Sequence, residues 1–142
     1  MMNISETEKE IIEEFELFDE WSEKYHYIIE IGQKLKSLDN KFKVDENRIK
    51  GCQSNVWLHA YGEYGNIFFE ADSDSVFVKG EIALLIRVLS GQKAEEIVNA
   101  DLNFIDTLGL RQHIAVTRAN GLASMIKQMK LFALGIQSQQ SA

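Results

Sequence analysis

The chain has one cysteine, Cys52, in the stretch Lys50–Trp57, which reads KGCQSNVW. Its place is unusual for a thiol that only fills space, because it follows a glycine at the polar entrance to an apolar run. Arg48 and Lys50 come just before it, and positive charge favours the thiolate, the nucleophilic form of cysteine. These features predict a reactive sulfur at Cys52. They leave open the alternative of an inert packing group.

A metal centre is the first chemistry that the residue types argue against. A structural zinc site takes four ligands, usually with several thiolates, and iron–sulfur clusters likewise need several thiolates. The chain offers one cysteine and three scattered histidines, His26, His59 and His113. We therefore expect no bound metal, although a cluster shared across a dimer interface stays open as an alternative.

Hydrolytic and redox chemistry form a second class that the residues disfavour. A hydrolytic cysteine needs a histidine within hydrogen-bond reach. His59 lies on the strand predicted after Cys52, where a rise of about 3.3 Å per residue keeps it out of reach, and His113 can approach only through the fold. A peroxidase or disulfide reductase would need a resolving cysteine, which the chain lacks. The role that remains is a nucleophile that receives a group, holds it and passes it to a partner.

Composition restricts the partners. The chain has 142 residues and a formal net charge of −7, so we expect one domain over residues 1–142 that binds neither nucleic acid nor an anionic membrane surface. No apolar run approaches the roughly 20 residues of a membrane-spanning helix. The acidic start and the lone thiol predict a cytoplasmic protein. Residues 1–5 and 136–142 are expected to fray.

Apolar residues at helical spacing predict helices at both ends of the chain. Near the N-terminus two helices form a hairpin: Ser5 and Glu8 have capping-box spacing for the first, and Asp19 can cap the second. Near the C-terminus a helix is expected to begin with a cap at Thr117 and to end at Gly135.

The middle of the chain predicts a small sheet. Alternating side chains indicate strands over residues 55–61 and 67–71, and a short third strand is expected at 76–78. A surface loop over 38–50 precedes them, and a helix that ends at Gly91 follows them. The fold class is therefore α+β, a three-stranded antiparallel meander packed against the N-terminal helical hairpin and the C-terminal helices.

The stretch Asn47–Trp57, NRIKGCQSNVW, resembles the signature around the sulfur-acceptor cysteine of the SufE family. These proteins assist SufS-type cysteine desulfurases in iron–sulfur cluster assembly. The resemblance extends from about Glu8 to Ile136. Its further segments are 21–32, 72–74, 78–80, 112–114 and 117–122.

The resemblance implies a fold akin to that of U-type scaffold proteins and a role in sulfur transfer. Cys52 would attack the outer sulfur of a persulfide on the desulfurase, stimulate that enzyme, and pass the sulfur to a cluster scaffold or another recipient. The desulfurase uses pyridoxal phosphate, whereas this chain would need no cofactor and would not itself be an enzyme. The alternative is a protein-interaction adaptor that keeps the fold, with Cys52 inert. Whether the chain forms a homodimer is left open.

Several residues are candidates to support Cys52. The residues expected to shape its loop are Gly51, Gln53 and Ser54. Ser54, or backbone N–H groups, would stabilise charge on the sulfur. Arg118, in the first turn of the last helix, would favour a nearby anion, Asp74 is placed near the loop by the resemblance, and His113 is a third candidate. Their alternatives are a surface ion pair, ordinary turn chemistry and a structural histidine, respectively.

Overall fold

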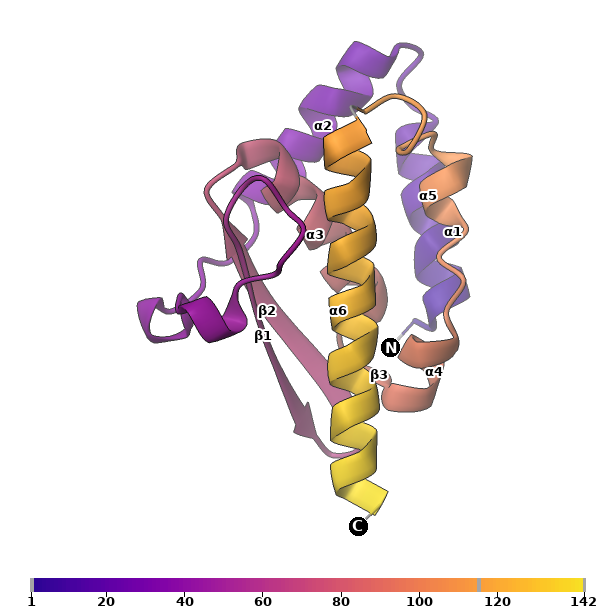
Figure 1. The fold of residues 1–142 in the computed structure, drawn as a ribbon. Coiled ribbons are helices and arrows are strands. Elements are labelled where there is room, and N and C mark those ends of the chain that lie inside the picture. The colour runs from indigo at the N-terminus through magenta and orange to yellow at the C-terminus, as the bar shows by residue number, and fades with distance from the viewer. Residues whose placement is uncertain (1, 115, 142) are drawn as a thin grey trace.

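The computed structural model describes residues 2–114 and 116–141, and the side chains of 2–114 and 119–138. Its elements in chain order are α1 (Ile4–Phe15), α2 (Trp21–Gln33), two 3₁₀ turns (Asn40–Phe42 and Asp45–Asn47), β1 (Val56–Glu63), β2 (Asn66–Ser73), α3 (Val76–Leu89), β3 (Gln92–Lys93), α4 (Ala94–Asn99), α5 (Phe104–Thr107) and α6 (Val116–Ser141). The fold is α+β, as predicted. In Figure 1, α6 lies in front, with the β1–β2 hairpin on one side of it and α1 on the other.

The sheet is antiparallel and has the order β1-β2-β3. β1 and β2 form a hairpin that pairs Val56 with Ser73 at one end and Glu63 with Asn66 at the other. Tyr64 and Gly65 make the turn, both with positive φ, which suits the twist of a two-residue hairpin connection. The first two predicted strands are confirmed.

The third strand was predicted at the wrong place. Val76, Phe77 and Val78 form the first turn of α3, whose N-cap Ser75 accepts a hydrogen bond from the Val78 amide through its hydroxyl. β-Branched residues favour strands, but here the cap and the apolar residues that follow continue as a buried helix. The third strand is instead β3, which pairs with the start of β2 just after α3 ends.

The helix ends also differ in detail from the prediction. The capping box of α1 is formed by Asn3 and Glu6, with the Glu6 amide donating to Asn3 Oδ1 at 2.8 Å, so Ser5 is not the cap. The N-cap of α2 is Glu20 rather than Asp19. α6 continues past Gly135 to Ser141. α6 begins at Val116, so the predicted cap Thr117 lies within the first turn of the helix instead.

The core is built around α3, which is buried along most of its length and packs on α2, β2, α1 and α6. Its closest neighbour is α2. A Cβ on Gly32 would lie 2.6 Å from the Gly80 nitrogen, and one on Gly80 would overlap the Ile28 carbonyl. The two glycines therefore let the helix backbones touch. This contact fixes α3 in the centre of the molecule, where it forms one wall of the site described next.

Candidate functional site

Cys52 lies in a short loop that leads into β1. The loop is closed at its base, because Arg48 pairs with Trp57 as an antiparallel bridge and the Ile49 amide donates to the Val56 carbonyl oxygen at 2.8 Å. We call residues 50–55, which lie between these pairs, the sulfur loop. Cys52 is half-buried there, at the junction of loop and strand that the sequence predicted.

The sulfur loop rests on α6 through two glycines. Gly51 has φ +90°, and a Cβ there would lie 2.5 Å from Ser124 Oγ, so both conformation and space favour glycine. On α6 itself, a Cβ on Gly121 would lie 3.5 Å from Cys52 Sγ. The thiol donates to the Gly121 carbonyl oxygen with an Sγ–O distance of 3.6 Å. The sulfur is therefore held against the helix backbone.

A cavity of about 110 Å³ lies beside the sulfur. It is enclosed by the sulfur loop, α3 and α6, and its lining residues are Cys52, Gln53, Ser54, Val78, Glu81, Gly121 and Met125. A water molecule occupies about 30 Å³ of the liquid, so the space is sufficient for an additional atom bound to Sγ. Of the predicted loop residues, Gln53 and Ser54 line the cavity, while Gly51 lies on its α6 side.

The electrostatics of Cys52 differ from the sequence expectation. Burial, and second the nearby Glu81, raise the pKa of the thiol above its ordinary value. Arg48 and Lys50 were expected to lower this pKa, but both side chains are exposed to solvent, where their effect is screened. Arg48 donates to Asn55 Oδ1 at 3.3 Å. This arrangement favours the protonated thiol more than water does.

Glu81 is a cavity residue that the sequence patterns did not single out. It is only 1% exposed and contributes to the cavity wall from α3. It follows Val78 by three residues and precedes Leu85 by four, and both are buried. A carboxylate on an otherwise apolar helix face is the signal that would have identified it.

Asp74 is joined to the sulfur loop but does not line the cavity. Its carboxylate accepts hydrogen bonds from the Asn55 backbone amide at 3.1 Å and from Asn55 Nδ2 at 2.9 Å. The neighbouring Ser73 hydroxyl donates to the Asn55 carbonyl oxygen at 2.8 Å. Asp74 thus anchors the end of the sulfur loop at the start of α3.

The other two candidates are not seen at the sulfur. His113 is exposed and stacks on Trp21 of α2 with ring centroids 4.6 Å apart, and it is not among the residues that line the cavity. The side chain of Arg118 lies outside the described residues. Its proposed contact with the sulfur therefore stays a prediction.

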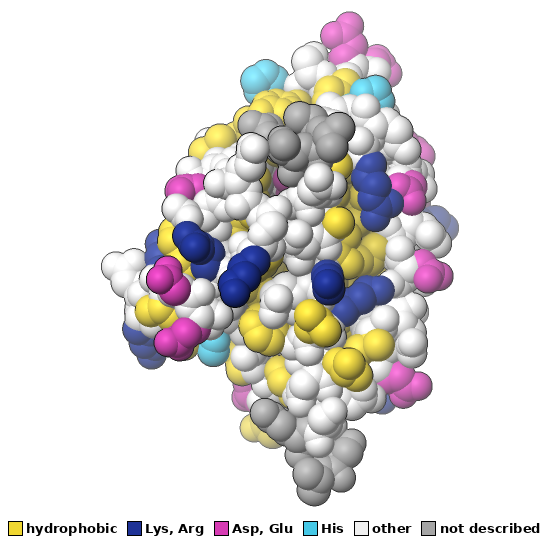
Figure 2. All heavy atoms as spheres, viewed as in Figure 1, with side chains coloured by type: hydrophobic (Ala, Val, Ile, Leu, Met, Phe, Trp, Pro, Cys, Tyr) yellow, Lys and Arg dark blue, Asp and Glu magenta, His cyan; other side chains and the backbone are white. Residues whose placement is uncertain are grey.

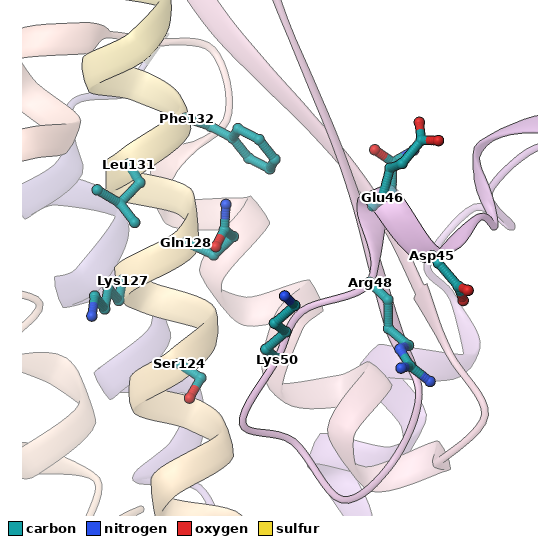
Figure 3. A pocket seen from close by; sticks show the side chains of 10 residues that line it. Asp45, Glu46, Arg48, Lys50, Ser124, Lys127, Gln128, Leu131 and Phe132 are labelled. Atoms are coloured by element: carbon teal, nitrogen blue, oxygen red, sulfur yellow. The ribbon is translucent and has the colours of Figure 1, made fainter.

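A groove of about 510 Å³ lies between α6 and the segment that leads into the sulfur loop, from which Asp45, Glu46, Arg48 and Lys50 line it. Figure 3 shows Arg48 and Lys50 coming from the loop side and Ser124 and Gln128 from α6. Lys127 also lines the groove. Figure 2 shows that Lys and Arg side chains gather on this face, where α6 lies in front, although the chain as a whole has a net charge of −7.

Two features of the described residues bear on other functions. Over 2–114 and 116–141, no group of three or more His, Cys, Asp or Glu side chains is arranged to hold a metal ion. In the same part of the chain, no helix is both long enough and apolar enough to cross a membrane.

Comparison with known proteins finds relatives over most of the chain. A family model described as SufE, Fe-S metabolism associated domain, matches residues 9–133. An uncharacterised SufE-like protein of Rhizobium meliloti is 39% identical, with 89% of this chain and 94% of that protein covered. SufE-like protein 1, chloroplastic/mitochondrial, of Arabidopsis thaliana is 41% identical over 91% of this chain but only 35% of its own length. The solution structure of a hypothetical protein from Thermus thermophilus has a TM-score of 0.77 at 19% identity, covering 93% of this chain and 96% of that one, which supports the fold alone.

Proposed function

Because this chain belongs to the SufE family, whose domain is associated with Fe-S metabolism, we propose that it accepts sulfur on Cys52. The donor is the persulfide of a SufS-type cysteine desulfurase, a pyridoxal phosphate enzyme that this chain stimulates by removing its product sulfur. The recipient is an iron–sulfur cluster scaffold or another sulfur-using protein. The chain acts as an accessory carrier with no cofactor of its own.

The transfer step is a displacement at sulfur. The Cys52 thiolate attacks the outer sulfur of the donor persulfide, a new S–S bond forms at Sγ, and the donor S–S bond breaks. The electron pair of the broken bond leaves with the donor cysteine as thiolate. The sulfur atom is moved from one thiol to another, so no external oxidant or reductant is required.

The observation that carries this proposal is the space beside Cys52 Sγ. The cavity of about 110 Å³ lies next to a half-buried sulfur that is held by the loop and α6. A persulfide needs room for one more atom and protection from other thiols. An inert packing cysteine would instead be expected in close contact with its neighbours on all sides.

Transfer requires the sulfur loop to move, because a donor must reach a sulfur that is half-buried. The loop is anchored at its ends, by the Ile49–Val56 hydrogen bond and by Asp74 on Asn55. Between these anchors Gly51 supplies backbone freedom. We expect the segment from Lys50 to Ser54 to swing outward as a short flap.

The groove beside the sulfur loop is suited to a protein partner. Three cations, Arg48, Lys50 and Lys127, line it together with two acidic residues, Asp45 and Glu46. The cations are in excess, which favours an acidic surface on the donor. The lone thiol fits a reducing compartment such as the cytoplasm, which we retain as the proposed location, while the plant relative is named for the chloroplast and mitochondrion. Homodimer formation is not required by this proposal.

The experiment is sulfur loading followed by intact mass measurement. The protein is incubated with a SufS-type desulfurase and L-cysteine under non-reducing, anaerobic conditions. Wild type is expected to gain one sulfur atom and to increase desulfurase turnover, whereas Cys52→Ser gains none and stimulates poorly. A wild type that stays at its original mass, or a Cys52→Ser variant that stimulates equally well, would overturn the proposal.

The adaptor alternative is separated by the same experiment. Slow alkylation of Cys52 would not distinguish the two functions, because burial and Glu81 raise the pKa of the thiol in the free protein. An adaptor with an inert cysteine would bind its partner without taking up sulfur. Partner binding that is unchanged by Cys52→Ala, together with no mass gain on wild type, would favour the adaptor.

A further inference from the structure

Glu81 is a buried acid in the wall of the sulfur cavity. It is 1% exposed, both of its carboxylate oxygens are inaccessible to solvent, and it shares the cavity of about 110 Å³ with Cys52. The main packing of α3 would be served equally well by an apolar side chain at this position, as at its neighbours Ile82 and Leu85. Burying a carboxylate costs free energy, so its presence in the same cavity as the nucleophile needs an explanation.

Two acidic groups in one small cavity oppose each other's ionisation. Burial disfavours each charge, and two negative charges in the same space repel. In water a glutamate ionises near pH 4.3 and a cysteine near pH 8.5, about four units apart. In this cavity burial, and second the nearby Glu81, raise the pKa of the Cys52 thiol. Both effects favour the protonated sulfur.

The other described side chains that line the cavity are not ionisable. From the sulfur loop they are Gln53 and Ser54, from α6 they are Gly121 and Met125, and from α3 Val78. Among the described lining residues, Cys52 and Glu81 are the two with ionisable side chains. Arg48 and Lys50 are exposed outside the cavity.

A hydrogen bond supports the same protonation state independently. Cys52 Sγ lies 3.6 Å from the Gly121 carbonyl oxygen and is the donor in that contact. A carbonyl oxygen has no proton to give, so the contact is favourable only for the thiol. A thiolate in this position would lie against the carbonyl oxygen of Gly121 and share the cavity with the side chain of Glu81.

We propose that Glu81 is a positioning residue that holds Cys52 as the neutral thiol while the sulfur loop rests on α6, so that the thiolate forms only when the loop swings out to a donor. The proposal deepens the sulfur-acceptor function and rests on it. By disfavouring the thiolate, Glu81 protects the sulfur from oxidants and alkylating agents while the loop rests on α6.

The test is the pH dependence of Cys52 alkylation in the free protein. Iodoacetamide modification is followed by intact mass from about pH 6 to pH 10 for wild type and Glu81→Gln, which removes the charge and keeps the shape. The midpoint of the rate profile is expected to fall in Glu81→Gln. The rate at pH 7 should rise by about tenfold for each unit of that fall.

Two further variants keep the result interpretable. Glu63→Gln removes the same charge at the exposed end of β1 and should leave the midpoint unchanged. Glu81→Leu supplies a second uncharged side chain should Glu81→Gln fold poorly, and it predicts the same downward shift. An unchanged midpoint in the uncharged Glu81 variants would overturn the proposal. A rate that rises by the same factor at every pH leaves the midpoint unchanged and would also overturn the proposal, because it would indicate only that the sulfur loop is more mobile.

This test is independent of the sulfur-acceptor function. No desulfurase is present in the alkylation experiment, so the midpoint can shift even if Cys52 never accepts sulfur. Conversely, sulfur loading with an unchanged midpoint would leave the acceptor function intact and remove the role of Glu81.

Discussion

At the scale of single residues, the site depends on two glycines, which have no side chain. Gly51 and Gly121 are the points at which the sulfur loop and α6 meet, and each leaves out a Cβ near another group. The Gly51 backbone also has a positive φ of 90°, which costs other residues roughly 1–2 kcal/mol. The loop can lie close to α6 because neither glycine carries a side chain that would separate the two segments.

Gly51→Ala is therefore expected to lower the free energy of unfolding by about 1–2 kcal/mol through backbone strain, with a further loss from the contact with Ser124 Oγ. Chemical denaturation measures both. In the double variant with Ser124→Ala, the contact part should be recovered and the strain part should remain. If the two single effects simply add, the contact with Ser124 makes no contribution and this account of Gly51 is wrong.

At the scale of elements, a buried carboxylate joins the end of β2 to α3 and to the segment that precedes the sulfur loop. Asp72, at the end of β2, is 5% exposed. It lies 3.1 Å from Lys43 Nζ and 3.3 Å from Lys79 Nζ, and it accepts the Ser73 amide at 2.8 Å. Burial alone would raise the pKa of this carboxyl, but its bonds to Lys43, the Ser73 amide and Lys79 outweigh burial and lower the pKa.

This lowered pKa predicts a pH-dependent contribution to stability. The folded state binds the Asp72 proton less well than the unfolded chain does, so the contribution is complete above the unfolded pKa of about 3.9. It is lost as the pH falls through the lower, folded value. Asp72→Asn should cost about 1.5–3 kcal/mol at pH 7. In urea unfolding, this difference from wild type should shrink below about pH 4, and a difference that stays constant into acid would contradict the account.

The same elements indicate how far the sequence alone could go. Alternation predicted β1 and β2 because one face of each strand is buried and the pattern is local. The prediction of a strand at 76–78 was wrong because β-branched residues can also begin a buried helix, here one that Ser75 caps. β3 has only two residues, too few for any periodicity, and is defined by pairing with β2.

The sulfur itself was predictable from local features, whereas its environment was not. Cys52 stands out by its type and by the glycine beside it. Glu81 and Gly121 are distant in sequence and meet it only because α3 and α6 pack on the sulfur loop. The direction in which the thiol pKa shifts depends on that packing. The cations Arg48 and Lys50 are near in sequence, and from them alone the opposite shift was expected.

At the scale of the whole molecule, charge is distributed unevenly. The net charge is −7, yet the face around α6 and the sulfur loop carries Lys and Arg side chains (Figure 2). Such a local reversal of sign orients an approaching partner more than it strengthens the complex. We expect it to guide the acidic surface of a donor toward Cys52.

Charge reversal at Lys50 tests this expectation. Lys50→Glu should slow sulfur uptake from the desulfurase by up to about tenfold at low salt, because electrostatic steering is lost. The difference from wild type should narrow at high salt. Lys93→Glu makes the same change in net charge at the exposed residue of β3, outside the groove, and should have little effect. Equal slowing by both variants would show that net charge alone is responsible.

The most direct test of the central claim is single-turnover transfer of sulfur. A desulfurase loaded with one equivalent of radiolabelled persulfide is separated from free cysteine, mixed with this protein, and resolved without reductant. The account predicts that the label moves to wild-type chain in near-stoichiometric amount and that none reaches Cys52→Ser. Label that stays on the desulfurase in the presence of folded wild type would contradict the claim that Cys52 is a sulfur acceptor.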